Sequence, residues 1–179
     1  MLNLTFFLFV LCLKSCYLWG CSILFEIGDN IVYPMQGAGI IESIIEKEIQ
    51  GDVQQYFVIR LLIKKMELMI PISKMDQSKI RLVVNSQTLE DVLQNFHNGQ
   101  SDLSLPYKER FKMNSEKMRT GNIKDGSEVV RDLMRIDKEK SLNSSEKQML
   151  ENAKKILISE LELIKGITET QAKELLLQN

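Results

Sequence analysis

Cations and one aromatic ring crowd a short stretch of the chain, residues 107–119, and they are the side chains best suited to chemistry with a partner. The stretch begins with Tyr107, has two acidic residues, and contains five basic ones: Lys108, Arg110, Lys112, Lys117 and Arg119. Ammonium and guanidinium groups suit phosphate contacts, and a flat ring at a helix entrance suits stacking or insertion at a base step. A nucleic-acid contact is one interpretation. A solvated helix face is the other.

The residues needed for enzyme or metal chemistry are scarce. All three cysteines, Cys12, Cys16 and Cys21, lie in the first 21 residues, and His97 is the one histidine. No P-loop, zinc-ligand spacing or nucleophile–base pair is present, and the glycines at residues 37–39 are too few for a dinucleotide-binding fingerprint. The sequence therefore predicts no enzyme, catalytic residue, metal, cofactor or small-molecule substrate.

Charge is distributed unevenly along a chain of ordinary composition. Of 179 residues, 44% are hydrophobic and 26% charged, and the formal net charge is −1. Residues 25–106 hold seven Lys/Arg against eleven Asp/Glu, a net charge of −4, whereas residues 107–179 hold fifteen against thirteen, a net charge of +2. The second half is therefore the better candidate to meet a polyanion.

The basic stretch lies within a run of predicted helices. Pro106 and Gly121 are typical of a helix start and a helix end. Periodic apolar residues and capping signals predict further helices over residues 88–97, with Thr88 and Asp91 as a capping box, over 125–140, from a cap at Asn143 or Ser144 to about 164, and from Thr168 onward. Their apolar stripes predict a compact core, since each large buried side chain contributes roughly 1.5–3 kcal/mol.

The region before these helices has the pattern of a small β-barrel. Residues 25–40 contain Phe25 and Ile27, a Gly-Asp turn at residues 28–29, then Ile31, then Pro34 and two glycines, which predicts two short strands joined by tight corners. Further strands are predicted over residues 40–49, 54–63, 66–70 and 80–84, with a hairpin turn at 50–52. The expected fold is α+β: a bent SH3/Tudor-like barrel of about five strands over residues 25–85, then a helical domain over residues 86–179, with a hinge at residues 98–104.

Two motifs resemble one family of proteins. The opening stretch, with its Gly37-Ala-Gly39, and the basic stretch, with an aromatic residue followed by Arg110, Phe111-Lys112, Asn114 and Gly121, are similar to the CarD/CdnL family of bacterial transcription regulators. The resemblance covers the chain from residue 25 to near its C-terminus. It implies that the barrel, shared with the transcription-repair coupling factor, binds the RNA polymerase β subunit, and that the helices bind promoter DNA at the upstream edge of the bubble.

The resemblance also implies site residues. The DNA-binding residues are expected to be Tyr107, Arg110, Lys112, Lys117, Arg119 and Arg131. Arg135 is expected to point toward the DNA backbone together with Arg131. The polymerase-binding residues are expected to be Lys47, Met69, Ile70 and Pro71, at a strand whose backbone could pair with a partner. A closed barrel without a free edge is the alternative. Tyr107 stands where the family usually has a tryptophan that wedges into the minor groove, so this wedge has less stacking area and keeps a hydroxyl.

The first 24 residues differ from the rest. Two apolar runs, residues 4–13 and 16–25, are interrupted by Lys14, and each is too short to span a bilayer. A signal peptide would need a basic start and a small-residue cleavage site, and neither is present. Residues 18–21 are similar to a lipoprotein processing box that ends at Cys21, but the bulky Trp19 stands where such a box usually has a small residue. The favoured interpretation is a mis-assigned start, with the working protein beginning at Leu24.

Together these observations and the resemblance predict a monomeric, cytoplasmic transcription regulator without enzyme activity. The resemblance implies that it binds the polymerase β subunit and promoter DNA and stabilises the open complex at ribosomal RNA promoters. No membrane contact is expected if the leader is an artefact. The alternative is a membrane-tethered or purely protein-binding module, in which the basic helix is only a solvated face.

Overall fold

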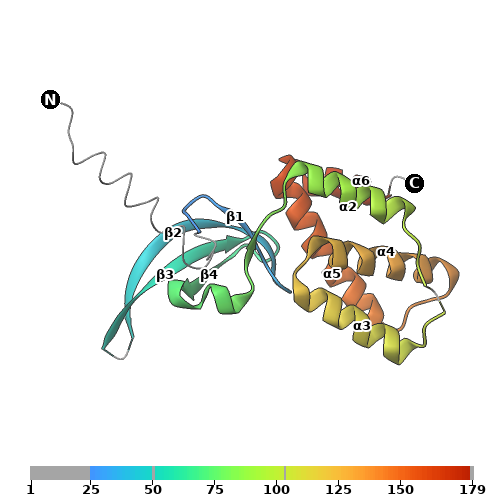
Figure 1. Ribbon diagram of the computed structural model, residues 1–179, viewed down its shortest axis with the longest axis horizontal. Coiled ribbons are helices and arrows are strands. Elements are labelled where there is room, and N and C mark those ends of the chain that lie inside the picture. Colours follow the sequence, from blue (N-terminus) through green and yellow to red (C-terminus); the bar gives the residue numbers. More distant parts are fainter. Residues whose placement is uncertain (1–24, 50, 103, 178–179) are drawn as a thin grey trace, which may run out of the picture.

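The computed structural model describes residues 25–49, 51–102 and 104–177, so the hypotheses about the first 24 residues lie outside the described part. A β-sheet comes first and a group of helices follows, as two lobes that meet side by side (Figure 1). The strands are β1 (Asn30–Tyr33), β2 (Gly37–Ile49), β3 (Asp52–Leu61), β4 (Met66–Pro71) and β5 (Arg81–Leu82). They form one antiparallel sheet in the order β4-β3-β2-β1-β5. The predicted α+β fold with five strands is confirmed.

The start of the barrel differs from the prediction. Neither Phe25 nor Ile27 lies in a strand: Ile27 belongs to a turn with Gly28, which has a φ of +96°. The turn is still tied to β2, because Gly28 N donates to the Ile41 carbonyl (2.8 Å) and Ile41 N donates to the Asp29 carbonyl (3.0 Å). The positive φ of Gly28 interrupts the strand here, and Phe25 is nevertheless buried in the barrel.

A glycine and a bulge allow β2 to bend across its neighbours. A Cβ at Gly39 would lie 2.7 Å from the Arg60 carbonyl oxygen on β3, so no larger residue fits that approach. Between Ile41 and Ser43 the pairing with β3 shifts by one residue, which is a β-bulge. The bent sheet encloses one apolar core: Phe25, Ile31, Ile41, Phe57, Ile59, Leu61, Ile70, Met75 and Ile80.

Strand β4 is an edge of this sheet. It pairs with β3 on one side and is the terminal strand in the sheet order, so the predicted edge position is confirmed among the described residues. The β2–β3 hairpin, which pairs from Gly39 with Leu61 to Ile49 with Asp52, reaches away from the helices (Figure 1). Two short 3-10 turns, η2 (Ile72–Lys74) and η3 (Asp76–Ser78), lead from β4 to β5.

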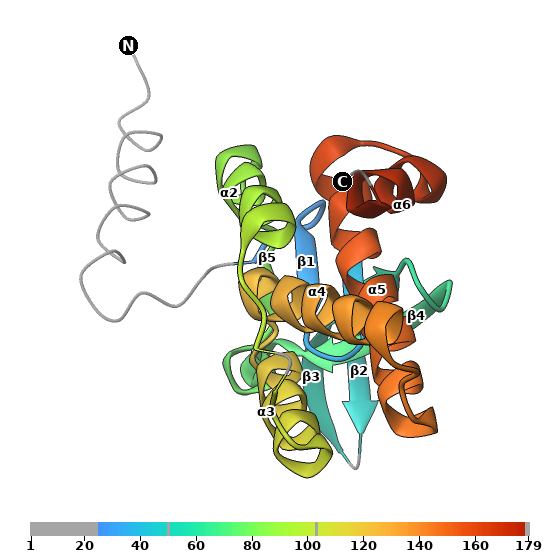
Figure 2. The same ribbon diagram turned by 90° about the vertical axis from the view of Figure 1, so that its right-hand side faces the viewer.

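Five helices make up the second lobe. They are α2 (Ser86–Asn98), α3 (Tyr107–Thr120), α4 (Ile123–Glu139), α5 (Ser144–Lys165) and α6 (Glu169–Leu177). Helix α4 lies between α2 and α3 in both views, and the long α5 crosses behind them toward the sheet (Figures 1 and 2). Their buried side chains form one core, which includes the predicted stripes Val129, Leu133, Ile136, Leu150, Ala153, Leu157 and Leu161.

Most helix ends follow the predicted capping chemistry. Asn143 accepts a hydrogen bond from Glu146 N at the start of α5, and Thr168 and Gln171 cap each other's backbone at α6. Gly121 ends α3 in the left-handed conformation, with a φ of +71°. One cap was predicted wrongly: Asn85, and not Thr88, caps α2, because its side chain accepts from Thr88 N at 2.8 Å.

Candidate nucleic-acid interface

Helix α3 carries an exposed basic stripe on the side that faces away from the bundle. Lys108, Lys112 and Arg119 are all exposed, and their spacing of four and seven residues places them on one line along the helix. Arg110, Asn114 and Met118 mark the opposite, buried side. Within the described chain none of the three stripe cations forms an ion pair. The stripe therefore offers its charge to an external anion.

Tyr107 stands beside this stripe at the first turn of α3. Its side chain is 41% exposed, and its ring lies 5.8 Å from the ring of Phe111 at a tilt of 47°. Such a tilted pair supports the tyrosine from behind without covering it. The exposed ring and the basic stripe are thus on the same helix at the outer margin of the helical lobe, where Figure 2 shows α3 below α4.

Arg110 is not part of the exposed set, which corrects the expectation that it spreads with the other cations of α3. The residue is only 6% exposed. Its Nη2 lies 2.6 Å from Glu146 Oε1 of α5, and its Nη1 donates to the Leu105 carbonyl at 2.8 Å. The spacing explains the result, because Arg110 lies four and eight residues before the buried Asn114 and Met118. The guanidinium thus ties the start of α3 to α5.

Arg131 is also buried, and it forms hydrogen bonds near the C-terminal end of α2. Its Nε donates to Asp132 at 2.8 Å and its Nη1 to the Asn95 carbonyl at 3.2 Å. Arg135, one turn further along α4, donates to the carbonyls of Gly99 (2.6 Å) and His97 (3.1 Å). Two arginines of α4 therefore hold the C-terminal end of α2 and the following loop.

These bonds bear on the predicted hinge at residues 98–104, of which residue 103 is outside the described part. Besides the Arg135 bond to Gly99, the Ser101 hydroxyl donates to Asp132 Oδ1 at 2.5 Å. The loop is therefore bonded to α4 on both sides of Gln100. Arg131 and Arg135 are thus bracing residues, and Arg131 is buried, so its guanidinium is not presented to an external phosphate.

Lys117 has an intermediate position. Its ammonium lies 2.8 Å from Glu128 Oε2 on α4, and its side chain is partly exposed. The carboxylate neutralises much of its charge, so Lys117 is a weaker candidate for phosphate than the stripe cations. Nearby, the buried Asn114 Nδ2 has no hydrogen-bond partner among the described residues.

The predicted polymerase-binding residues divide between the two faces of the sheet. Lys47 and Met69 are exposed, and the pairing of β2, β3 and β4 places them with the half-buried Pro71 on the outer face. Ile70 points the other way into the barrel core and is only 7% exposed. Of the four, Ile70 can meet a partner only through its backbone, while Met69, 45% exposed, presents its side chain.

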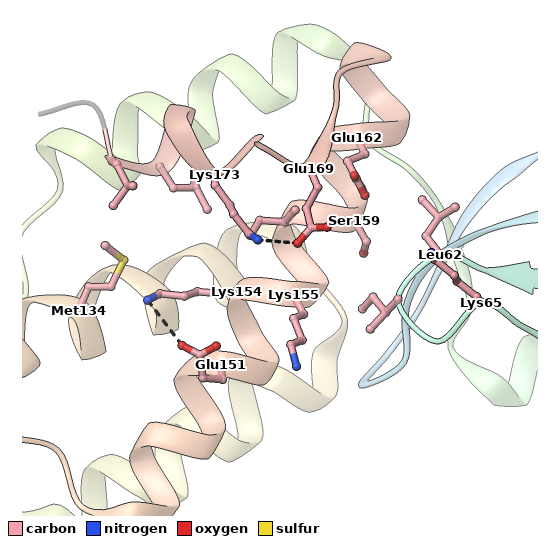
Figure 3. A pocket seen from close by; sticks show the side chains of 14 residues that line it. Leu62, Lys65, Met134, Glu151, Lys154, Lys155, Ser159, Glu162, Glu169 and Lys173 are labelled. Atoms are coloured by element: carbon pink, nitrogen blue, oxygen red, sulfur yellow. Dashed lines mark ion pairs between the residues drawn. The ribbon is translucent and has the colours of Figure 1, made fainter. Parts of the chain in front are cut away.

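A cavity of about 420 Å³ lies between the β3–β4 turn and helices α5 and α6 (Figure 3). Cations and carboxylates alternate around it: Lys173 Nζ is 2.6 Å from Glu169 Oε1, and Lys154 Nζ is 3.9 Å from Glu151 Oε1. The Lys173 hydrogen bond holds the pKa of Glu169 below its usual range, while burial, and then the charge of Glu169, raises the pKa of Glu162. The cavity thus has no concentration of one charge comparable with α3.

The described residues contain no group of three or more His, Cys, Asp or Glu that could hold a metal. No helix in the same part of the chain is long and apolar enough to cross a membrane.

Comparison with known proteins assigns both lobes to one class of transcription factor. The CarD-like/TRCF RID domain model matches residues 25–84, and the model for the C-terminal domain of CarD matches residues 91–177. Putative transcription factor YdeB of Bacillus subtilis (strain 168) is 58% identical over 150 residues, which cover 84% of this chain and 98% of that protein. The chain therefore belongs to the CarD family of transcription regulators.

One solved structure is similar to part of this chain. The solution NMR structure of the 72-residue N-terminal domain of Myxococcus xanthus CarD is 27% identical, and the match covers 35% of this chain and 84% of that one, with a TM-score of 0.29.

The buried partner of Arg110 is the feature that sequence reasoning missed. Glu146 is 3% exposed and lies in the first turn of α5, where its Oε2 also accepts from Asn143 Nδ2 at 2.9 Å. The signal was present in the spacing of Arg110, Asn114 and Met118, since one of the three is apolar and all share a helix face. That spacing predicts that Arg110 is buried, and it does not identify the carboxylate that pairs with it.

Proposed function

We propose that the protein is a non-enzymatic adaptor that binds the RNA polymerase β subunit through its barrel and promoter DNA through α3. It stabilises the open promoter complex, with ribosomal RNA promoters as the first targets. One copy of the chain acts, without a cofactor or small-molecule substrate. The proposed DNA-binding residues are Tyr107, Lys108, Lys112 and Arg119, with a smaller contribution from Lys117.

The observation that carries the proposal is the exposed stripe of α3. Lys108, Lys112 and Arg119 lie on one line opposite the buried side of the helix, so they can meet a run of phosphates together. Such contacts fix position and carry no base sequence information. The half-exposed Tyr107 ring at the helix start supplies a flat group for the edge of the melted region, where a base step is already partly unstacked.

Stabilisation of the open complex requires a difference in affinity between two states of the promoter. A ring that stacks on an exposed base step binds opened DNA better than closed DNA, and that difference shifts the equilibrium toward the open state. The barrel contact strengthens the effect, because docking on polymerase raises the effective concentration of a weak DNA contact. No chemical step is needed.

The barrel contact is proposed for the edge of β4. An edge strand offers unpaired backbone groups to a strand of a partner, and the exposed Met69 side chain lies on that strand. The exposed Lys47 lies on the same face of the sheet, two strands away on β2. The match of this lobe to the CarD-like/TRCF RID domain supports polymerase as the partner.

The open-complex lifetime tests the proposal. Open complexes on a ribosomal RNA promoter are challenged with a DNA competitor, with and without the protein, at concentrations at which binding to polymerase is saturated. We expect a longer lifetime in its presence. An unchanged lifetime under saturation would overturn the function.

The barrel contact has its own test in Met69→Glu. A carboxylate at the β4 edge opposes strand addition, so binding to the isolated β subunit should fall by about tenfold or more. The matched control is Glu67→Gln on the same strand, an exposed position where a charge is removed and not added. Equal affinity of wild type and Met69→Glu for the β subunit would move the contact away from this edge.

A further inference from the structure

The barrel and the helical lobe are joined by a polar contact in the C-terminal part of α5. Ala38 N of β2 donates to Ser159 Oγ of α5 at 3.0 Å, and Ser159 in turn donates to the Ile156 carbonyl. The next residue, Glu160, is only 1% exposed and accepts from Arg81 of β5. Two successive residues of one helix therefore engage two strands of the sheet.

Arg81 makes the widest set of bonds at this junction. Its Nη1 and Nη2 donate to the two carboxylate oxygens of Glu160 at 2.7 and 2.9 Å, a bidentate pair. Its Nε donates to the Gly121 carbonyl at 2.7 Å. Gly121 is the residue that ends α3, so one guanidinium from the barrel holds both the helical core and the end of the candidate DNA helix.

The same end of α3 also packs closely against the barrel at Pro34. Gly121 has a φ of +71°, and a Cβ on it would lie 2.7 Å from Pro34 Cγ in the β1–β2 turn. The bidentate arrangement also restricts rotation, since a planar fork meets both carboxylate oxygens in one orientation. Removing Arg81 would leave a buried carboxylate without its cation, which is unfavourable in this packing.

The opposite end of α3 is fixed within the helical lobe. Arg110 joins its first turn to Glu146 of α5 and to the Leu105 carbonyl. Helix α3 is thus attached at its start to α5 and at its end to the barrel. Helix α5 is itself bonded to β2 through Ser159, and the second attachment joins α3 to the barrel directly.

We infer that Arg81 is a positioning residue that fixes the orientation of α3 relative to the barrel through Glu160 and Gly121. This inference rests on the proposed function in one respect: a fixed orientation presents the polymerase contact and the DNA contact at one spacing, so both can be made at once. With a loose junction, most orientations would satisfy one contact without the other, and the effective concentration would fall.

The orientation itself is measured without any reference to function, by NMR residual dipolar couplings of the full chain. Couplings of the barrel and of the helices should fit one common alignment tensor in the wild type. They should require two different tensors in Arg81→Ala and Glu160→Gln. Arg60→Ala is the matched control, because Arg60 also pairs with a carboxylate, Glu42, but does so on the exposed surface of the barrel. A common tensor in both junction variants would overturn the inference.

The functional consequence is read from three quantities in the same variants. Affinity for polymerase and affinity for promoter DNA should each stay within about twofold of wild type, while the gain in open-complex lifetime should fall by about tenfold. A stability defect alone would lower the melting temperature and leave the lifetime gain at saturation unchanged, and that outcome would overturn the positioning role. Arg81→Lys, which keeps one bond to Glu160 but cannot fork, should give an intermediate gain.

Two outcomes separate this inference from the proposed function. If wild-type protein does not lengthen the lifetime, the proposed function is wrong, and the dipolar couplings still decide whether Arg81 sets the orientation. If wild type lengthens the lifetime and Arg81→Ala does so equally with two tensors, Arg81 fixes the orientation but the functional consequence drawn from it is wrong, and the proposed function stands. Should Arg81→Ala not fold, Glu160→Gln and Arg81→Lys carry the test.

Discussion

The two sides of α3 use the same kind of side chain for opposite purposes. Arg110 on the inner side is buried, paired with Glu146 and bonded to the Leu105 carbonyl. Lys112 and Arg119 on the outer side are exposed and free of ion pairs within the described chain. A buried cation depends on its partner for stability, whereas an exposed cation keeps its charge available for a ligand. Membership of a basic run therefore does not by itself make a residue a phosphate contact.

The largest expected effect concerns the inner side. Arg110→Ala leaves Glu146 buried without its cation, so the free energy of unfolding should fall by about 3–5 kcal/mol. Urea unfolding monitored by circular dichroism measures it. Lys112→Ala, on the outer side of the same helix, is the control and should change the free energy by less than about 0.5 kcal/mol. Equal effects of the two substitutions would contradict the division of α3 into two sides.

The next effect concerns the outer side and appears in the salt dependence of DNA binding. Lys112→Ala removes one phosphate contact, so the slope of log K against log salt should become shallower by about one unit. Fluorescence anisotropy at a series of salt concentrations measures it. Lys138→Ala, an exposed lysine of α4, should leave the slope unchanged. A slope that responds equally to both lysines would point to diffuse attraction and not to the stripe.

The smallest expected effect is a change in melting temperature, and it concerns the cavity between the β3–β4 turn, α5 and α6, where, in contrast to α3, cations and carboxylates alternate. Burial, and then the charge of Glu169, raises the pKa of Glu162 from its ordinary 4.5. The folded state therefore holds this proton to higher pH than the unfolded state does, and folding loses stability as the pH rises through that window. Glu162→Gln removes the loss, so the melting temperature at pH 7 should rise by on the order of 1 °C.

At about pH 3, where Glu162 is protonated in both states, the two proteins should melt at the same temperature. The exposed Glu174→Gln makes the same change of charge on α6 and serves as the control. A gain from Glu162→Gln that persists unchanged at acid pH would show that the substitution acts by packing and not by charge.

The sequence predicted local structure well where a few residues determine it. Asn143, Thr168 and Gly121 mark helix ends through bonds within one turn of the chain, and Val129, Leu133 and Ile136 show the period of a buried helix face. The segment with Phe25 and Ile27 was predicted as a strand because the two residues alternate like strand residues, whereas the turn predicted at Gly28 and Asp29 is present. There the backbone conformation of a glycine outweighs the side-chain pattern.

Contacts between distant segments were beyond the same reasoning. Arg110 meets Glu146 across 36 residues, and Arg81 meets Glu160 across 79. Each pairing depends on how the helices cross, which no local pattern specifies. The sequence therefore did not reveal that Arg110 and Arg131, two of the predicted DNA contacts, are buried and bonded within the protein. Tyr107, Lys112 and Arg119, in contrast, lie exposed on α3.

The measurement that tests the central claim most directly is the open-complex lifetime with variants of Tyr107. In Tyr107→Ala the stacking ring is lost and the basic stripe remains. We expect most of the gain in lifetime to disappear while affinity for polymerase and the melting temperature stay close to wild type. Tyr107→Trp, with a larger ring, should match or exceed the wild-type gain. A lifetime in Tyr107→Ala equal to that of wild type would contradict the account of α3 as the element that holds the promoter open.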